Sequence, residues 1–174
     1  MKKAATLGMV LLLALNVGCS QEKEAKGKEL TKTEASSSKN AEKSALLDFE
    51  VSLGAKLRDY QAPFNAYTAA LDPEKKTPKS EIRKLKEAAK TAGQKAAKEI
   101  PDLDVPSSLP KEDQQTFKMA FKDLGASYQT KAEGLGDEKK TAQSDEEFQK
   151  FQDQVNKIHK KLGLIDANFA NELQ

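Results

Sequence analysis

Apolar residues fall into four stripes along the chain, each at helical spacing. In the first stripe, from Leu46 to Leu71, every step between apolar positions is three or four residues. The other three stripes have the same spacing, which places their apolar residues on one face of an amphipathic helix. The pattern predicts four helices, over residues 44–71, 78–99, 110–135 and 144–173.

Local signals define how these helices begin, bend and end. Pro63 lies inside the first stripe, and because the stripe continues in register we predict a kink there rather than an end. Ser144 with Glu147 three residues later matches a capping box and predicts the start of the last helix. The last stripe crosses Gly163 without a slip, so that helix is expected to continue to residue 173.

The predicted helices account for one domain, residues 44–174. Short connections favour antiparallel neighbours, so we expect an all-α antiparallel helical bundle of three to four helices. All ten aromatic residues lie on the first, third and fourth stripes, which indicates a core rather than an exposed stacking surface. The face of the second helix consists mainly of alanine, and such small residues permit close approach of a neighbouring helix.

The N-terminus has the organisation of an export signal. Lys2 and Lys3 precede an uncharged, mostly apolar run over residues 4–18, and the run ends at Cys19. A basic start followed by an apolar segment of roughly 7–15 residues is typical of a secretory signal peptide. The run is shorter than the ~20 residues that a helix needs to span a bilayer.

The residues Asn16-Val17-Gly18-Cys19 resemble the lipobox of bacterial lipoproteins, in which the cysteine becomes the lipidated first residue. Val17 and Gly18 fit that pattern; Asn16 departs from it, because an apolar residue is usual at that position. The resemblance implies that residues 1–18 are a signal peptide and that Cys19 carries the lipid. Lipidation would also use the only cysteine, leaving no thiol for disulfides or metal sites.

Residues 19–43 have low hydrophobicity, mixed charges and a run of three serines. Such a segment buries too little apolar surface to offset its ordering entropy, so we expect a flexible tether. A lysine-rich composition and a long tether are similar to those of small surface lipoproteins of Gram-positive bacteria. The resemblance implies a location on the extracytoplasmic face of the cell membrane.

The net charge of the exported part does not support nucleic acid as a partner. The chain has 29 basic and 27 acidic residues, and Lys2 and Lys3 belong to the signal, so the exported part carries 27 of each. This balance gives no basis for binding nucleic acid. A basic side of the second helix could instead meet anionic wall polymers or lipid headgroups, although it could equally be a solvated face: Lys79, Arg83, Lys86 and Lys90.

A few other side chains are candidates for chemistry. Tyr60 and Tyr67 would line a ligand groove if a kink at Pro63 opened the bundle; packing in the core is the alternative. His159 is the only histidine and is surrounded by lysines, which favours a role in packing or at the surface over metal binding. The acidic pair at positions 102 and 104 is explained by solvation in a loop, and the acidic run 145–147 by helix capping.

No nucleotide-binding, nucleophile-elbow, zinc-protease or EF-hand spacing occurs in the sequence. We therefore expect a non-catalytic protein with no cofactor, held at the membrane by Cys19, with a binding, scaffolding or assembly role at the cell envelope. Its partner would be an envelope protein or a wall polymer. Two alternatives are a small-solute or metal-binding lipoprotein with a pocket in the bundle, and a wall-polymer binder that uses the basic side of the second helix. The near-heptad stripe of the last helix also suits assembly with another copy.

Overall fold

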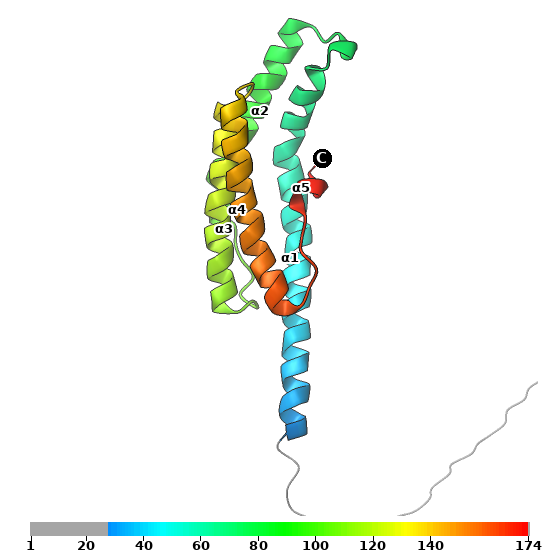
Figure 1. The fold of residues 1–174 in the computed structure, drawn as a ribbon, viewed down its shortest axis with the longest axis vertical. Helices are drawn as coiled ribbons and strands as arrows, with labels where there is room; N and C mark the ends of the chain where they lie inside the picture. Colours follow the sequence, from blue (N-terminus) through cyan, green and yellow to red (C-terminus); the bar gives the residue numbers. More distant parts are fainter. Residues whose placement is uncertain (1–27, 174) are drawn as a thin grey trace, which may run out of the picture.

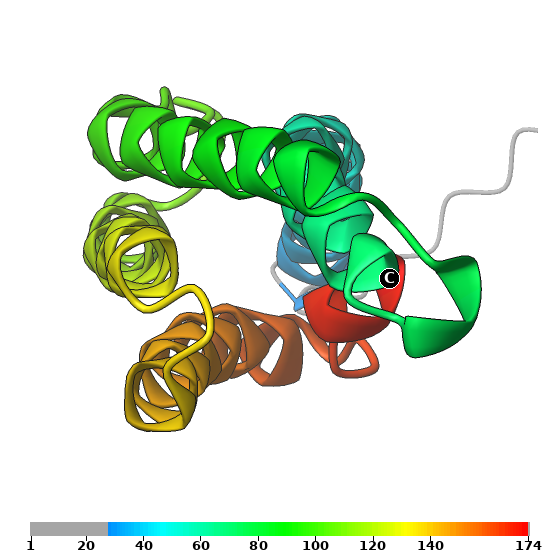
Figure 2. The ribbon, with the colours of Figure 1, turned by 90° about the horizontal axis from the view of Figure 1, so that it is seen from above.

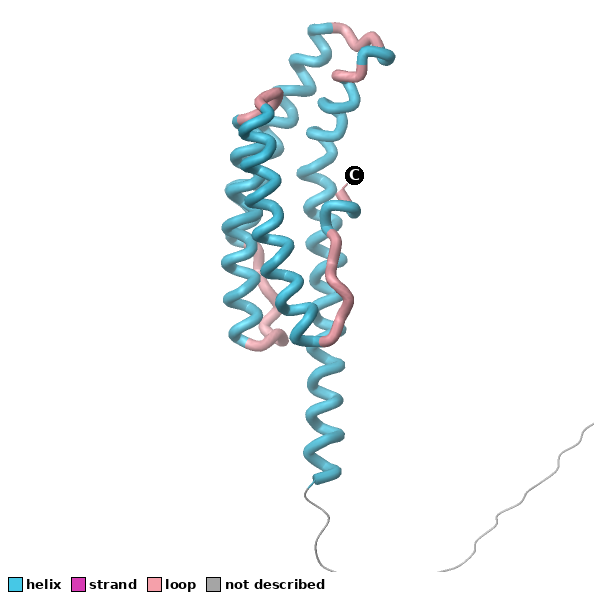
Figure 3. Tube along the Cα trace, viewed as in Figure 1, coloured by secondary structure: helices cyan, strands magenta, loops and turns pink. Residues whose placement is uncertain are grey.

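A computed structural model describes residues 28–173, with side chains from residue 38 onward, and this part of the chain is helical without strands (Figures 1 and 3). The all-α prediction is therefore confirmed. The elements, in chain order, are α1 (Lys28–Ala70), η1 (Pro73–Lys75), α2 (Lys79–Glu99), η2 (Ile100–Asp102), α3 (Lys111–Glu133), α4 (Glu138–Leu162) and α5 (Phe169–Glu172).

The four long helices run up and down as an antiparallel bundle (Figures 1 and 2). Helices that follow one another in the chain make the main contacts: α1 packs on α2, α2 on α3, and α3 on α4. In contrast, α1 and α4 pack less closely, and the C-terminal segment with α5 lies between them (Figure 2). The bundle thus has three tightly packed sides and one side that the C-terminus closes.

α1 begins much earlier than predicted. The expected flexible tether (19–43) ends at 27 at the latest, because residues 28–43 are already helical and continue into the predicted first helix. Residues 38–41 are exposed and Leu46 is the first fully buried residue, so packing starts where the apolar stripe starts. The helix extends further because adding residues to a formed helix avoids the cost of nucleation. Lysine, glutamate and alanine then favour its growth.

The packed part of α1 follows its stripe. Its buried apolar side chains are Leu46, Leu53, Leu57, Tyr60, Phe64 and Tyr67. Pro63 lies inside α1 and does not end it, which confirms that part of the prediction. Figure 1 shows that its first turns project alone beyond one end of the bundle, while the α1–α2 turn extends beyond the α3–α4 turn at the other end.

α2 contacts its neighbours through small residues. Ala89, Gly93 and Ala96 are its buried positions, as the alanine-rich face predicted. A Cβ atom at Gly93 would lie 2.6 Å from Cβ of Ala132 on α3 and 2.8 Å from Cζ of Phe64 on α1. Only a residue without a side chain fits where these three helices meet.

α3 supplies the centre of the core. Its predicted stripe is buried, including Phe117, Phe121 and Leu124, none of which has exposed surface. Phe49 of α1 packs edge-on against Phe117, with ring centroids 5.2 Å apart. Pro110 is the N-cap residue of α3 rather than its first helical residue, a shift of one position.

The predicted start of the last helix is wrong. α4 begins at Glu138 with Asp137 as its N-cap, whose side chain accepts hydrogen bonds from the amides of Lys139 and Lys140. Ser144 is instead buried inside α4, and its hydroxyl donates to the carbonyl oxygen of Ser127 on α3 at 3.0 Å. The Ser144 hydroxyl bonds a neighbouring helix instead of capping its own, since a serine side chain can form either hydrogen bond.

The predicted end of that helix is also wrong. α4 stops at Leu162, and Gly163 takes a left-handed conformation (φ 69°) as its C-cap. Glycine adopts this conformation without steric cost, which makes it a frequent helix terminator. Phe169 and Leu173 are nevertheless buried, as their stripe predicted, because the chain turns back and returns them to the core through α5.

The close approach at Gly93 generates a stability prediction. Replacing Gly93 with alanine should lower the free energy of unfolding by about 1–3 kcal/mol, because the new methyl group overlaps Ala132 and Phe64. Chemical denaturation followed by circular dichroism measures this change.

Gly54→Ala is the matched control. A Cβ at Gly54 would meet the ends of two flexible side chains, Oε2 of Glu172 at 3.0 Å and Nη1 of Arg58 at 3.6 Å. Alanine there should leave stability unchanged or raise it by up to about 1 kcal/mol. Equal destabilisation by both variants would contradict the assignment of Gly93 as the tight contact.

Candidate functional site

The basic side of α2 is where the sequence placed it. Lys79, Arg83, Lys86 and Lys90 are all exposed, and none forms an ion pair with the side chains that the structure describes. α2 as a whole carries seven basic and three acidic residues. Its first half lies near the α1–α2 turn, at the end of the molecule opposite the start of α1 (Figure 1).

The two candidate tyrosines do not share a groove. Tyr60 points toward α2, where its hydroxyl donates to Oε2 of Glu99 at 2.5 Å. Burial, together with this bond to a carboxylate, raises the pKa of Tyr60 to about 12. Tyr67 lines a different depression, next to Phe64 and Lys131. Each ring is buried in the core, which agrees with the packing alternative.

A cleft between α1 and α4 is lined by core side chains together with polar ones. It consists of two depressions of about 180 Å³ each, which share Gln61, Lys131, Ser144 and Asp145. α1 and α4 form its walls, α3 supplies Lys131 from the floor, and Ala170 and Leu173 close one end. The cleft exists because α1 and α4 pack less closely than the other neighbouring helices.

Lys131 is the charged group at the centre of this cleft. Its Nζ donates to Oε1 of Gln61 at 3.1 Å and lies 5.0 Å from the centre of the Phe64 ring. Burial lowers the pKa of Lys131, and the nearby carboxylate of Asp145 opposes that effect. Nothing in the sequence distinguishes Lys131, because a single lysine on a helix with several lysines has no distinctive spacing.

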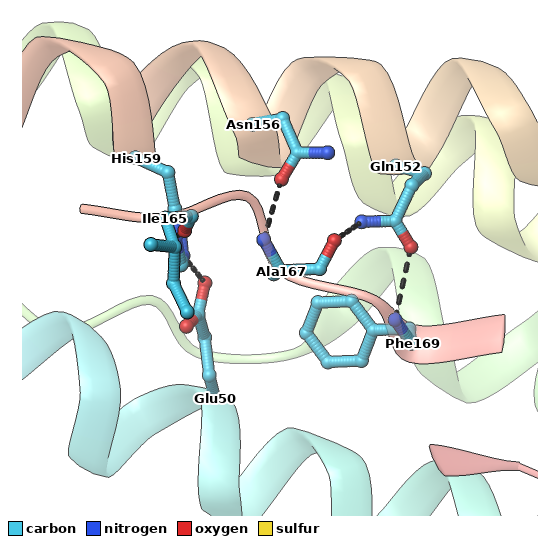
Figure 4. A network of polar contacts seen from close by, with 7 residues as sticks. All are labelled: Glu50, Gln152, Asn156, His159, Ile165, Ala167 and Phe169. Carbon is cyan, nitrogen blue, oxygen red and sulfur yellow. Dashed lines mark hydrogen bonds and ion pairs between the residues drawn. The ribbon is translucent and has the colours of Figure 1, made fainter. Parts of the chain in front are cut away.

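A second polar cluster joins the C-terminal segment to α4 and α1 (Figure 4). Gln152 donates from Nε2 to the carbonyl of Ala167 at 2.5 Å and accepts from the amide of Phe169 at 3.0 Å. Asn156 accepts from the amide of Ala167 at 2.8 Å. These side chains satisfy backbone groups of a segment that has no regular structure of its own.

His159 completes the cluster and is buried rather than at the surface. Its Nδ1 lies 2.5 Å from the carbonyl oxygen of Ile165, and its Nε2 lies 2.7 Å from Oε1 of Glu50 on α1. Both contacts are satisfied when each ring nitrogen carries a proton and Glu50 is a carboxylate, because both partner atoms then accept hydrogen bonds. Burial lowers the pKa of His159, but the bonds to Glu50 and Ile165 outweigh it and the net pKa is raised.

Sequence reasoning missed Glu50, Gln152 and Asn156. A signal was present for Glu50, which continues the three-and-four spacing of the α1 stripe between Leu46 and Leu53. A carboxylate in such a position indicates a buried partner of opposite charge.

The predicted acidic groups do not form a metal centre. Among the residues that the structure describes, no three histidine, cysteine, aspartate or glutamate side chains are grouped so as to hold a metal ion. Asp145 lines the cleft instead of capping a helix, and Asp102 and Asp104 border an open depression beside η2. Capping as the explanation of the acidic run 145–147 is therefore wrong, since these residues lie inside α4.

Cys19 and the signal segment lie outside the described residues. Within residues 28–173, none of the helices has both the length and the apolar character required to cross a membrane. In comparisons with known proteins, no family model, curated protein or solved structure matches this chain.

The His159 cluster generates a pH prediction. The folded state raises the pKa of His159 above its unfolded value of 6.5, so the protonated ring stabilises the fold fully below that pH. This stabilisation should be lost as pH rises through the folded-state pKa. Denaturation between about pH 5 and pH 9 should show it, and His159→Gln should abolish this part of the pH dependence.

Gln152→Ala is the control for that experiment. It removes two hydrogen bonds to the same C-terminal segment but no titratable group. We expect it to lower stability by about 1–3 kcal/mol at every pH while leaving the pH dependence intact. A wild-type stability that does not fall between about pH 6.5 and 9, or that falls to the same extent in His159→Gln, would refute the buried imidazolium.

Proposed function

We propose that this chain is a lipoprotein anchored to the outer face of a bacterial cell membrane, with a non-catalytic binding or scaffolding role in the envelope. The support for the anchor is in the sequence: two lysines, an uncharged apolar run and a lipobox-like segment that ends at Cys19. The lysine-rich composition is similar to that of Gram-positive surface lipoproteins. The helical domain would then face outward from the membrane.

The geometry of α1 is the observation that best supports this role. α1 starts only nine residues after Cys19 and continues for 43 residues, which corresponds to about 65 Å at 1.5 Å per residue. Its first turns stand clear of the bundle, and the α1–α2 turn lies at the opposite end (Figure 1). In a chain anchored at Cys19, the helix from Lys28 onward would hold that far end away from the lipid surface.

A binding surface for anionic wall polymer is the more specific candidate. The four basic residues on α2, at positions 79, 83, 86 and 90, are exposed and lie toward the end that would face away from the membrane. Exposed cations of this kind attract a polyanion through screened electrostatics, so the attraction weakens as salt is added. Their distance from the start of α1 favours a polymer beyond the membrane over the headgroups of the membrane that holds the anchor.

Other features of the described residues suit a structural role. The near-heptad stripe of α4 is buried inside the monomer through Phe151, Val155, Ile158 and Leu162, so it packs on this chain rather than on another copy. The single histidine holds the C-terminal segment in place. These groups have partners in the fold that account for them without catalysis.

The anchor has a direct test. Cys19→Ala should abolish incorporation of labelled fatty acid in cells, because the residue that would accept the lipid is lost. The protein should also be released or retained with an uncleaved signal, which fractionation and immunoblotting detect. Ser20→Ala is the control and should be labelled normally; labelling of the Cys19 variant would end the lipoprotein proposal.

The polymer-binding surface has a separate test. Reversing the charge of Lys79, Arg83, Lys86 and Lys90 to glutamate should reduce retention on purified cell walls at least about tenfold at low salt, through loss of several cation–anion contacts. Wild-type retention should fall as salt increases. Sedimentation of the protein with the wall fraction measures both effects.

The control for this test is an equal charge reversal elsewhere on the bundle. Lys118, Lys122, Lys150 and Lys157 are exposed on α3 and α4 and have no ion pair with the described side chains. If both sets of substitutions reduce retention equally, net charge rather than the α2 surface controls binding. Unchanged retention in the α2 variant would remove the wall-polymer candidate.

A further inference from the structure

We propose that the cleft between α1 and α4 is a binding site for a small organic monocarboxylate, with the ammonium group of Lys131 as the anchor for the carboxylate. The site lies on the side of the bundle closed by α5 and is distinct from the basic surface of α2. It therefore adds a second binding activity and stands independently of wall-polymer binding.

The first argument is that Lys131 has a single hydrogen-bond partner among the described side chains. A lysine ammonium has three donors, and here one of them is used by Gln61 Oε1 at 3.1 Å. Within residues 38–173, no carboxylate lies within ion-pair distance of Lys131 Nζ. The face of the Phe64 ring lies 5.0 Å from the ammonium nitrogen.

Two other lysines that reach across helix boundaries provide a contrast. Lys161 of α4 contacts Asp113 of α3 at 2.8 Å, and Lys140 of α4 contacts Glu133 of α3 at 2.9 Å. Lys131 is more deeply placed than either, yet an amide oxygen and an aromatic face stand where those two have carboxylates. A partly desolvated cation gains most from a charged partner, so an anion entering the cleft would be bound favourably.

The second argument is the shape of the cleft around Lys131. The two depressions meet at this residue, and together they approach the lower end of the roughly 300–1,000 Å³ range of small-molecule sites. Apolar side chains line both arms: Phe148 and Leu173 in one, and Phe64, Tyr67 and Leu135 in the other. A compact apolar body can therefore lie beside the charged group, as small-molecule sites usually require.

Asp145 restricts the charge of the ligand. Its carboxylate is on the rim of both depressions and is close enough to influence the pKa of Lys131. Its negative charge disfavours a ligand with two or more negative charges, such as a phosphate monoester dianion, because like charges repel in a partly enclosed site. One carboxylate on a small apolar body fits best.

A pair of isosteric probes tests the proposal: phenylacetate and its neutral analogue phenylacetamide. Each is titrated into the purified full chain in detergent, with lysine labelled at Cε and binding followed by nuclear magnetic resonance. Phenylacetate should bind in a saturable manner, shift the Lys131 signal and raise its titration midpoint. Phenylacetamide should bind at least about tenfold more weakly, since it lacks the charge-assisted hydrogen bond.

Variants give opposite expected effects at the same site. Lys131→Gln should weaken phenylacetate binding at least about tenfold, whereas Asp145→Asn should strengthen it by removing a repulsive charge. Lys139→Gln is the matched control: Lys139 is exposed on α4 and does not line the cleft. Circular dichroism confirms that each variant is folded.

The results that overturn the proposal are specific. They are no saturable binding of phenylacetate to the folded wild type, equal binding of the acid and the amide, or unchanged binding in Lys131→Gln. Weakened binding in Asp145→Asn would equally refute the role assigned to that carboxylate. None of these outcomes bears on retention by cell walls, so the two proposals fail independently.

Discussion

The contact at Gly93 is the constraint on which the arrangement of the bundle depends. At this position α2 meets Phe64 of α1 and the α3 backbone at Tyr128 together, with no room for a side chain. Ala89 and Ala96 extend the same narrow surface by one turn in each direction. α2 can therefore lie close to two helices at once, which leaves the large aromatic side chains to fill the space between α1, α3 and α4.

The side of the bundle between α1 and α4 is packed differently from the other three sides. α3 and α4 approach closely through small residues, where Ser127 and Ser144 exchange hydrogen bonds between side chain and backbone. α1 and α4 pack less closely, and the C-terminal segment closes part of the space between them. That segment has no regular structure from 164 to 168, so side chains of α4 must satisfy its backbone groups. The buried imidazolium of His159 then ties the segment and α4 to Glu50 of α1. The part of the gap that α5 leaves open is the cleft around Lys131.

The start of α1 and the basic surface of α2 lie at opposite ends of the molecule, whereas the cleft lies on its side. One end is the start of α1, closest in sequence to Cys19, and the other is the α1–α2 turn beside the basic half of α2. A long continuous helix connects them, so the distance between anchor and basic surface is set by helix geometry. The cleft opens between α1 and α4, away from α2, which would allow the two proposed binding activities to coexist.

The sequence by itself determined the helical class, most residues of the core and the approximate position of each helix, since apolar periodicity depends only on which face of a helix is buried. Ile165, which the last stripe placed in the core, is instead 90% exposed, because α4 ends before it. It also contained the basic residues of α2, whose spacing alone puts them on one side. Tertiary structure decided what local signals left ambiguous. Ser144 was equally suited to cap its own helix or to bond a neighbour, and the position of Ser127 settled this. Gly163 interrupted no periodicity, yet it takes a left-handed conformation that ends α4, and the chain turns back there. The pairing of Glu50 with His159 and the isolation of Lys131 arise from residues distant in the chain, because burial and partner distance exist only after the helices have packed.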